Sequence, residues 1–351
     1  MDDVSRTSRL SACMPAHKGF PALQGKIACS NESSMSTPLR YVVVTPARNE
    51  VQFIELAIKS VVAQKVRPLK WVIISDGSTD GTDEIVRKYC TEYPWMELVR
   101  MPERSERNFA GKVHAFNAGY ARVKDLQFDA IASMDADISF DSEYFSFLLE
   151  ELGRDPRLGL VGTPFQSASN QTYDYRFTSI EHVSGACQLF RRECFEEIGG
   201  YVPLKAGGID LAAVIAARVK GWETRTFVEK VCVHHRELGA ALGGVLGERF
   251  RQGVKDYTFG GHAVWELFRF VYQMSRRPII LGGFALGAGY SWAAIRRVPR
   301  PISSEMVAFR KREQMQRLKT LLVRRSRVPI SRNESGLVAT PGSHSSRRPS
   351  V

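Results

Sequence analysis

Asp135 and Asp137 directly follow the apolar run 131–134 and are separated by a single alanine. Residues two apart on an extended chain point to the same face, so the two carboxylates should converge. Close carboxylates repel each other, and a divalent cation removes that conflict. Mg²⁺ or Mn²⁺ prefers oxygen ligands and fills its shell with phosphate oxygens. The pair predicts a metal site for a diphosphate, while the alternatives are a helix cap at Asp137 or two solvated loop acids.

Three other polar stretches follow apolar runs, namely PARNE (46–50), SDGSTDGT (75–82) and HHR (234–236). In the second, Asp76 is placed to accept a hydrogen bond from a base or a ribose. The alternative for the residues after Gly77 is that they cap the following helix. In the third, one of the two histidines could complete the metal shell, or both could be hydrogen-bonded structural groups.

Lys112 and Asp210 each begin an expected helix. Gly111 and Lys112 precede a helix whose first amides can face an anion, although the spacing excludes a P-loop and Lys112 could be a plain exposed lysine. Asp210 follows two glycines. It is a candidate general base beside the metal site, and the alternative is an N-cap.

The elements that must position these residues alternate between strands and helices. Continuous β-branched runs such as 41–45 and 71–75 predict fully buried strands, and segments such as FIELAIKSVVAQ show helical spacing of apolar residues. This order over about 40–236 predicts an α/β fold with a parallel sheet covered on both faces. Ligands of such sheets bind at the carboxyl ends of the strands, where the four polar stretches lie.

Composition and charge exclude several classes of function. The 351 residues are 44% hydrophobic and 25% charged, which is typical of a globular protein. Residues 296–351 carry 14 Lys/Arg and 3 Asp/Glu, a net +11 of the chain's +12. This tail motivates a nucleic-acid-binding alternative, but no RNA or DNA motif is present, so no nucleic-acid partner is expected. No G-x-G-x-x-G follows the first strand, which disfavours a dinucleotide-dependent dehydrogenase.

Compartment and domain organisation follow from the remaining patterns. The six scattered cysteines contain no CxxC pair and indicate reduced thiols in the cytoplasm. Residues 1–37 and 327–351 are expected to be disordered. Residues 241–326 are glycine-rich, aromatic and basic and include the uncharged stretch 278–295, so we predict a membrane-associating helical extension. The alternatives are a true membrane span and a buried helix hairpin that is broken by glycines.

Taken in order, five segments resemble family 2 glycosyltransferases, which are inverting enzymes with the GT-A fold. The segments are VVVTPARNE, VIISDGSTDGT, GKVHAFNAGY, MDADISF and GACQLFRRECFEEIGGY. The resemblance covers about 40–236 and implies a GT-A domain over 38–240. It further implies transfer of a sugar from a nucleotide-diphospho-sugar to an acceptor hydroxyl, with Mg²⁺ or Mn²⁺ as cofactor.

The resemblance also implies roles for individual residues. The donor-binding residues would be Pro46, Arg48, Glu50, Asp76, Lys112 and Asp135. Asp135, Asp137 and His235 would hold the metal, with His234 competing for the last place. Asp210 would be the catalytic base, but Ile209 stands where the family has the first acid of a Glu-Asp pair. A non-catalytic GT-A-like protein is therefore the alternative.

The family often serves envelope polysaccharide or glycolipid synthesis. We therefore expect a carbohydrate or lipid-linked acceptor, and a position on the cytoplasmic face of an anionic membrane.

Overall fold

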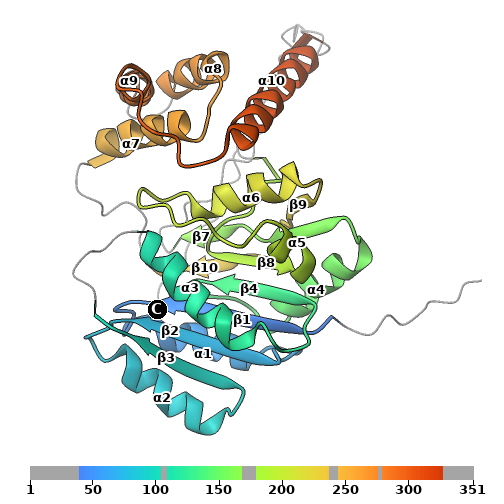
Figure 1. Cartoon of the computed structure of the whole chain (residues 1–351). Coiled ribbons are helices and arrows are strands. Elements are labelled where there is room, and N and C mark those ends of the chain that lie inside the picture. Colours follow the sequence, from blue (N-terminus) through green and yellow to red (C-terminus); the bar gives the residue numbers. More distant parts are fainter. Residues whose placement is uncertain (1–38, 104–108, 168–178, 237–243, 276–278, 327–351) are drawn as a thin grey trace, which may run out of the picture. The chain divides into compact units, whose positions relative to one another are not determined.

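The computed structural model describes residues 39–103, 109–167, 179–236, 244–275 and 279–326 (Figure 1). The two segments expected to be disordered, 1–37 and 327–351, lie outside the described residues.

A seven-stranded sheet in the order β3-β2-β1-β4-β8-β6-β9 forms the centre of the fold (Figure 1). Its strands, in chain order, are β1 (Tyr41–Ala47), β2 (Lys70–Asp76), β3 (Met96–Met101), β4 (Ala130–Met134), β6 (Leu158–Gly162), β8 (Cys187–Arg191) and β9 (Glu223–Thr226). Neighbouring strands pair in parallel except at β8, which is antiparallel to β4 and to β6. The predicted mostly parallel α/β sheet is confirmed.

Helices cover both faces of this sheet. Along β1, Tyr41 and Val43 enter one apolar cluster, and Val42 and Val44 enter the other. Because both faces are buried, the strand has no polar alternation. The first cluster is covered by α1 (Ile54–Val62), α2 (Thr82–Glu92) and α4 (Tyr144–Arg154), and the second by α3 (Ala110–Val123), α5 (Arg192–Glu197) and α6 (Ile209–Val219).

A second sheet of three short strands has the order β5-β10-β7. Its strands are β5 (Ile138–Ser139), β7 (Phe165–Ser167) and β10 (Cys232–His234). The sequence predicts that the HHR stretch ends a strand, and β10 is that strand, although it belongs to this second sheet. The antiparallel register pairs His234 with Ile138, so the histidine lies beside the segment that carries the two aspartates.

Four helices complete the described chain, namely α7 (Gly244–Thr258), α8 (Ala263–Met274), α9 (Leu281–Ile295) and α10 (Ser304–Ser326). Phe259, Met306 and Val307 enter the apolar cluster of α6. Helix α9 packs against α7 and α8 and runs unbroken through its glycines, so the alternative of a glycine-broken hairpin is wrong. Among the described helices, none combines the length and apolar character needed to cross a bilayer.

Candidate active site

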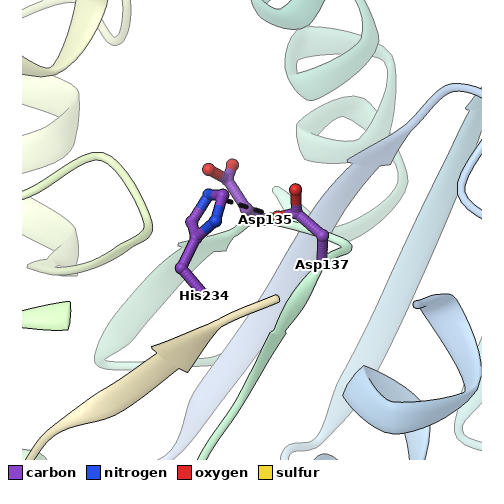
Figure 2. A group of neighbouring side chains, drawn as sticks. All are labelled: Asp135, Asp137 and His234. Carbon is purple, nitrogen blue, oxygen red and sulfur yellow. Dashed lines mark ion pairs between the residues drawn. The ribbon is translucent and has the colours of Figure 1, made fainter. Parts of the chain in front are cut away.

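Two carboxylates and one imidazole meet just beyond β4 (Figure 2). Asp135, Asp137 and His234 each offer one ligand atom, and these atoms lie within 4.8 Å of one another. His234 Nε2 is 3.6 Å from Asp137 Oδ1, and both residues are more than nine-tenths buried. Two hard oxygens with one imidazole nitrogen form a donor set that fits Mn²⁺ or a similar divalent cation.

The structure places His234 in this group, whereas the family resemblance implies His235 as the metal ligand. The His235 Nε2 forms a 2.7 Å hydrogen bond with Ser139 Oγ. Its ring stacks on Phe53 with 6.2 Å between the ring centroids. Neighbouring residues at the end of a strand point in different directions, so the two histidines cannot both face the aspartates. The geometry favours His234, and a metal-binding role for either histidine stays a proposal.

The two predicted aspartates are in an electrostatically costly position. Burial raises the pKa of Asp135, the Lys112 ammonium opposes that rise, and the charge of Asp137 adds to it. Asp137 precedes β5 and lies away from the start of α4, whose N-cap is Glu143. The interpretation of Asp137 as a helix cap is therefore wrong.

Lys112 connects the metal group to Asp210. Its ammonium forms an ion pair with Asp135 and lies 3.4 Å from the Gly185 carbonyl. Burial lowers the pKa of Lys112, but the charges of Asp135, Asp210 and Asp137 reverse this effect, so the pKa is raised. A Cβ atom on Gly185 would lie 3.1 Å from the Asp210 Cβ, which places Asp210 against the same loop. The interpretation of Lys112 as a plain exposed lysine is wrong.

Asp210 lies in the first turn of α6, where the N-cap is Gly208 with φ +87°. Asp210 is therefore not the N-cap. The preceding Ile209 is buried in the apolar cluster beneath α6, so an acid at that position would point into the core. Burial lowers the pKa of the nearby His182, and the negative charge of Asp210 opposes this effect without reversing it. The buried His182 Nδ1 has no hydrogen-bond partner among the described residues.

The loops after β1 and β2 are joined by hydrogen bonds between them. Asn49 lies in the left-handed region at φ +56°. Its backbone amide donates to Ser78 Oγ at 3.1 Å, and its Oδ1 accepts from the Thr79 amide at 2.9 Å. The Glu50 amide donates to Thr82 Oγ1 at 2.8 Å. These contacts give the polar side chains of the second loop a role in holding the two loops together.

Helix capping explains only part of that loop. The N-cap of α2 is Gly81, which makes no side-chain cap bond. Asp80 Oδ1 does accept the amide of Thr82 at the start of the helix, at 3.1 Å, and its Oδ2 accepts from Val51 at 3.0 Å. Asp80 thus serves both the helix and the neighbouring loop.

The donor-side residues predicted from the sequence lie at the ends of these two strands. Pro46 is in β1, half-buried. Asp76 ends β2 and is buried, and its Oδ2 is 3.9 Å from Arg48 Nη1. The pair is close enough to fix both side chains beside the loop junction.

Arg236 is a site residue that the sequence analysis left without a role. Its Nε is 3.2 Å from Asp137 Oδ2, and its Nη2 forms an ion pair with Glu50. Burial and, to a smaller extent, the charge of Asp137 raise the pKa of Glu50. Arg236 opposes this rise, and the resulting pKa is about 7. Arg236 offsets part of the negative charge of Glu50 and Asp137. The signal in the sequence was its place in the HHR stretch, two residues after His234.

Comparison with known proteins shows what this chain is similar to. Residues 42–199 match the sequence model described as Glycosyl transferase family 2. Over these residues the chain is similar to the family 2 glycosyltransferases. The poly-beta-1,6-N-acetyl-D-glucosamine synthase of Staphylococcus aureus (strain COL) is 25% identical over 235 residues, which cover 62% of this chain and 53% of that protein. This chain spans about half the length of the curated relatives it matches.

Two solved glycosyltransferase structures share the fold of this domain. One is the mannosyltransferase PcManGT from Pyrobaculum calidifontis in complex with GDP-Man and Mn²⁺, with a TM-score of 0.51, 19% identity and coverage of 82% of this chain and 81% of that chain. The other is GalNAc-T7 with UDP, GalNAc and Mn²⁺, with a TM-score of 0.52, 13% identity and coverage of 84% and 59%. The predicted GT-A fold is confirmed.

Proposed function

We propose that this glycosyltransferase transfers a sugar from a nucleotide-diphospho-sugar to an acceptor hydroxyl and inverts the configuration of the anomeric carbon. The observation that carries the proposal is the meeting of Asp135, Asp137 and His234 with Lys112 and Asp210 at one end of the sheet. The names of the similar proteins support it, since one is a synthase of poly-beta-1,6-N-acetyl-D-glucosamine and two structures hold GDP-Man or UDP with Mn²⁺.

On the donor side, the joined loops after β1 and β2 would bind the nucleoside. Asp76 would accept a hydrogen bond from the base or ribose, with Pro46, Arg48 and Glu50 beside it. Lys112 would place its cation near the diphosphate. A Mg²⁺ or Mn²⁺ ion held by Asp135, Asp137 and a histidine would offset the charge of the departing nucleoside diphosphate.

On the acceptor side, Asp210 would take the proton of the attacking hydroxyl. The hydroxyl oxygen forms the new bond to the anomeric carbon from the face opposite the departing diphosphate, so the configuration inverts in one displacement. No covalent intermediate on the chain is required. Arg236 would keep Glu50 and Asp137 from repelling the anionic donor.

The acceptor and the place of the reaction are inferred from the named relative. A polysaccharide or lipid-linked carbohydrate acceptor agrees with the glucosamine polymer of the staphylococcal synthase. We therefore infer a role in cell-envelope or extracellular polysaccharide or glycolipid synthesis, at the cytoplasmic face of an anionic membrane. Nucleic acid has no part in this proposal.

The donor half of the proposal is tested by calorimetric titration of the purified chain with UDP, GDP, CDP and dTDP, each with and without Mn²⁺. One nucleotide should bind at least tenfold more tightly with Mn²⁺, and Asp137→Ala should abolish that gain. Asp141→Ala, an exposed aspartate four residues further along, is the matched control. Absence of nucleotide binding together with salt-sensitive RNA binding would refute the proposal.

The catalytic half is tested by Asp210→Asn, which keeps the shape of the side chain but removes the base. Turnover should fall by about 10²–10⁴-fold, the usual contribution of a positioned base, while the donor Kd changes less than threefold. NMR of the product should show the anomeric configuration opposite to that of the donor. Parent protein that binds the donor but turns over no acceptor would favour the non-catalytic alternative.

A further inference from the structure

Helix α9 buries its smallest side chains against its neighbours. Small residues predominate on its buried face, which is made of Gly282, Gly283, Leu286, Gly289 and Ala293. A Cβ atom on Gly289 would lie 2.0 Å from the Phe250 carbonyl oxygen of α7, a separation that real side chains do not allow. The backbones of α7 and α9 therefore touch directly.

Two further glycines, one on α7 and one on α9, also lie close to the backbone of a neighbouring helix. A Cβ on Gly253 of α7 would lie 2.0 Å from the Leu286 carbonyl oxygen of α9. A Cβ on Gly283 would lie 2.8 Å from the Phe270 carbonyl oxygen of α8. Small residues at helix contacts with large residues turned outward is the pattern of helices packed in lipid, where water does not drive large side chains inward.

The opposite face of α9 exposes four large apolar side chains. Leu281 is 57% exposed, Phe284 55%, Trp292 46% and Ile295 81%. At 100° per residue these four lie within an arc of about 80°, on the side of the helix away from the glycines. The exposed residues Ile279 and Ile280 directly precede them. This apolar surface, 279–281 with Phe284, Trp292 and Ile295, is contiguous along the helix.

Basic residues border the apolar surface. Arg296, Arg297 and Arg300 follow α9 directly and are exposed. Trp292 lies one turn before them, and tryptophan next to arginine is typical of the boundary between acyl chains and headgroups. A second copy of this chain docked with its α9 parallel to this one would bring the same arginines toward each other, which disfavours that arrangement.

We propose that the apolar surface of α9 lies on an anionic lipid bilayer, with its residues among the acyl chain ends and Arg296 and Arg297 at the phosphate headgroups. The opposite face of the helix is occupied by α7 and α8, so α9 binds in the plane of the interface. This inference deepens the membrane position in the proposed function and assigns it to one helix face.

The first test measures sedimentation of the full chain with vesicles of phosphatidylcholine alone or with 30% phosphatidylglycerol. The variant carries Leu281→Ser, Phe284→Ser and Ile295→Ser. The control carries Leu56→Ser and Leu69→Ser, two exposed leucines elsewhere on the chain. We expect binding to anionic vesicles to fall at least tenfold in the variant and less than twofold in the control, with unchanged melting temperatures.

The second test needs only one conservative substitution, Trp292→Phe. Trp292 should be quenched by vesicles that contain brominated acyl chains, and the Trp292→Phe chain should lose that quenching while it still binds. A basic tail that binds electrostatically cannot reproduce this signal, because it does not bring Trp292 to the acyl chains.

Three outcomes would overturn the inference. They are vesicle binding of the serine variant equal to the parent, equal quenching with and without Trp292, and a parent dimer that the serine substitutions dissociate without any effect on vesicle binding. Mn²⁺-dependent nucleotide binding of the serine variant is measured without vesicles. Vesicle binding equal to the parent, with Mn²⁺-dependent nucleotide binding retained, would refute this inference alone. Vesicle binding that the serine substitutions abolish, in a chain that binds no nucleotide, would refute the proposed function alone.

Discussion

Replacement of Gly119 by alanine should destabilise the domain, because α3 lies directly on the sheet at this residue. A Cβ there would be 2.5 Å from Val44 Cγ1 and 3.2 Å from Ile74 Cγ1. Both partners are fully buried in the sheet, and an ordinary contact between carbons is about 3.5–4.0 Å. Either the two side chains leave their rotamers or α3 lifts from β1 and β2.

The net cost follows from two opposing effects. Overpacking a filled core costs about 1–3 kcal/mol. Alanine recovers up to about 1 kcal/mol of helix propensity relative to glycine. We expect a net loss of about 1–2 kcal/mol of unfolding free energy. Lys112 lies two turns earlier on the same helix, so a lifted α3 also moves its ammonium from Asp135 and should weaken donor binding.

Gly153→Ala is the matched control, since it makes the same substitution in α4. The nearest atom to its added Cβ is Leu39 Cδ1 at 3.9 Å, an ordinary contact. This variant should gain about 0.5–1 kcal/mol. Calorimetric melting resolves the two, because 1 kcal/mol corresponds to about 2–4 °C in a domain of this size. A Gly119→Ala protein that melts at or above the parent would refute the close-packing argument.

The remaining predictions concern the metal group and a buried acid. His234→Gln should reduce the Mn²⁺-dependent gain in nucleotide affinity at least tenfold, while His235→Gln should change it less than threefold; the reverse ranking in a calorimetric titration would restore His235 as the ligand. Burial raises the pKa of Glu266, between α8 and its neighbours, from 4.5 to about 7, with the charge of Asp256 adding to the rise and Arg269 opposing it. The folded protein therefore keeps a proton that the unfolded chain releases, and stability falls as pH rises from 4.5 to 7 and changes no further from this group above pH 7. Glu266→Gln should thus be more stable than the parent at pH 8, by up to about 3 kcal/mol, and the advantage should shrink steadily toward pH 4.5 in denaturant titrations; an advantage independent of pH would show that Glu266 does not titrate in this range.

The sequence by itself determined the α/β architecture. Strands buried on both faces must be continuously apolar, and helices on them must be amphipathic, so local composition alone predicts β1, β2 and α1. The place of the loops at the carboxyl ends of β1, β2 and β4 follows from the chain order as well. These are properties of short segments, so the sequence of a single chain is sufficient to predict them.

Only the tertiary structure decided which neighbours of those segments enter the site. Arg236 meets Asp137 and Glu50 across 99 and 186 residues of chain, and no local pattern encodes such a meeting. The choice of His234 over His235 depends on the register of β10 with β5. Ile209 occupies its position because the first turn of α6 faces an apolar cluster.

The same holds for α9, whose glycines were compatible with a broken hairpin. Whether a glycine breaks a helix or permits close contact depends on what lies beside it, and here the carbonyls of α7 and α8 lie there. The composition of 278–295 predicts an apolar segment. Which of its faces remains exposed is a consequence of packing between helices, because side-chain burial is set by the neighbours and not by the residue type alone.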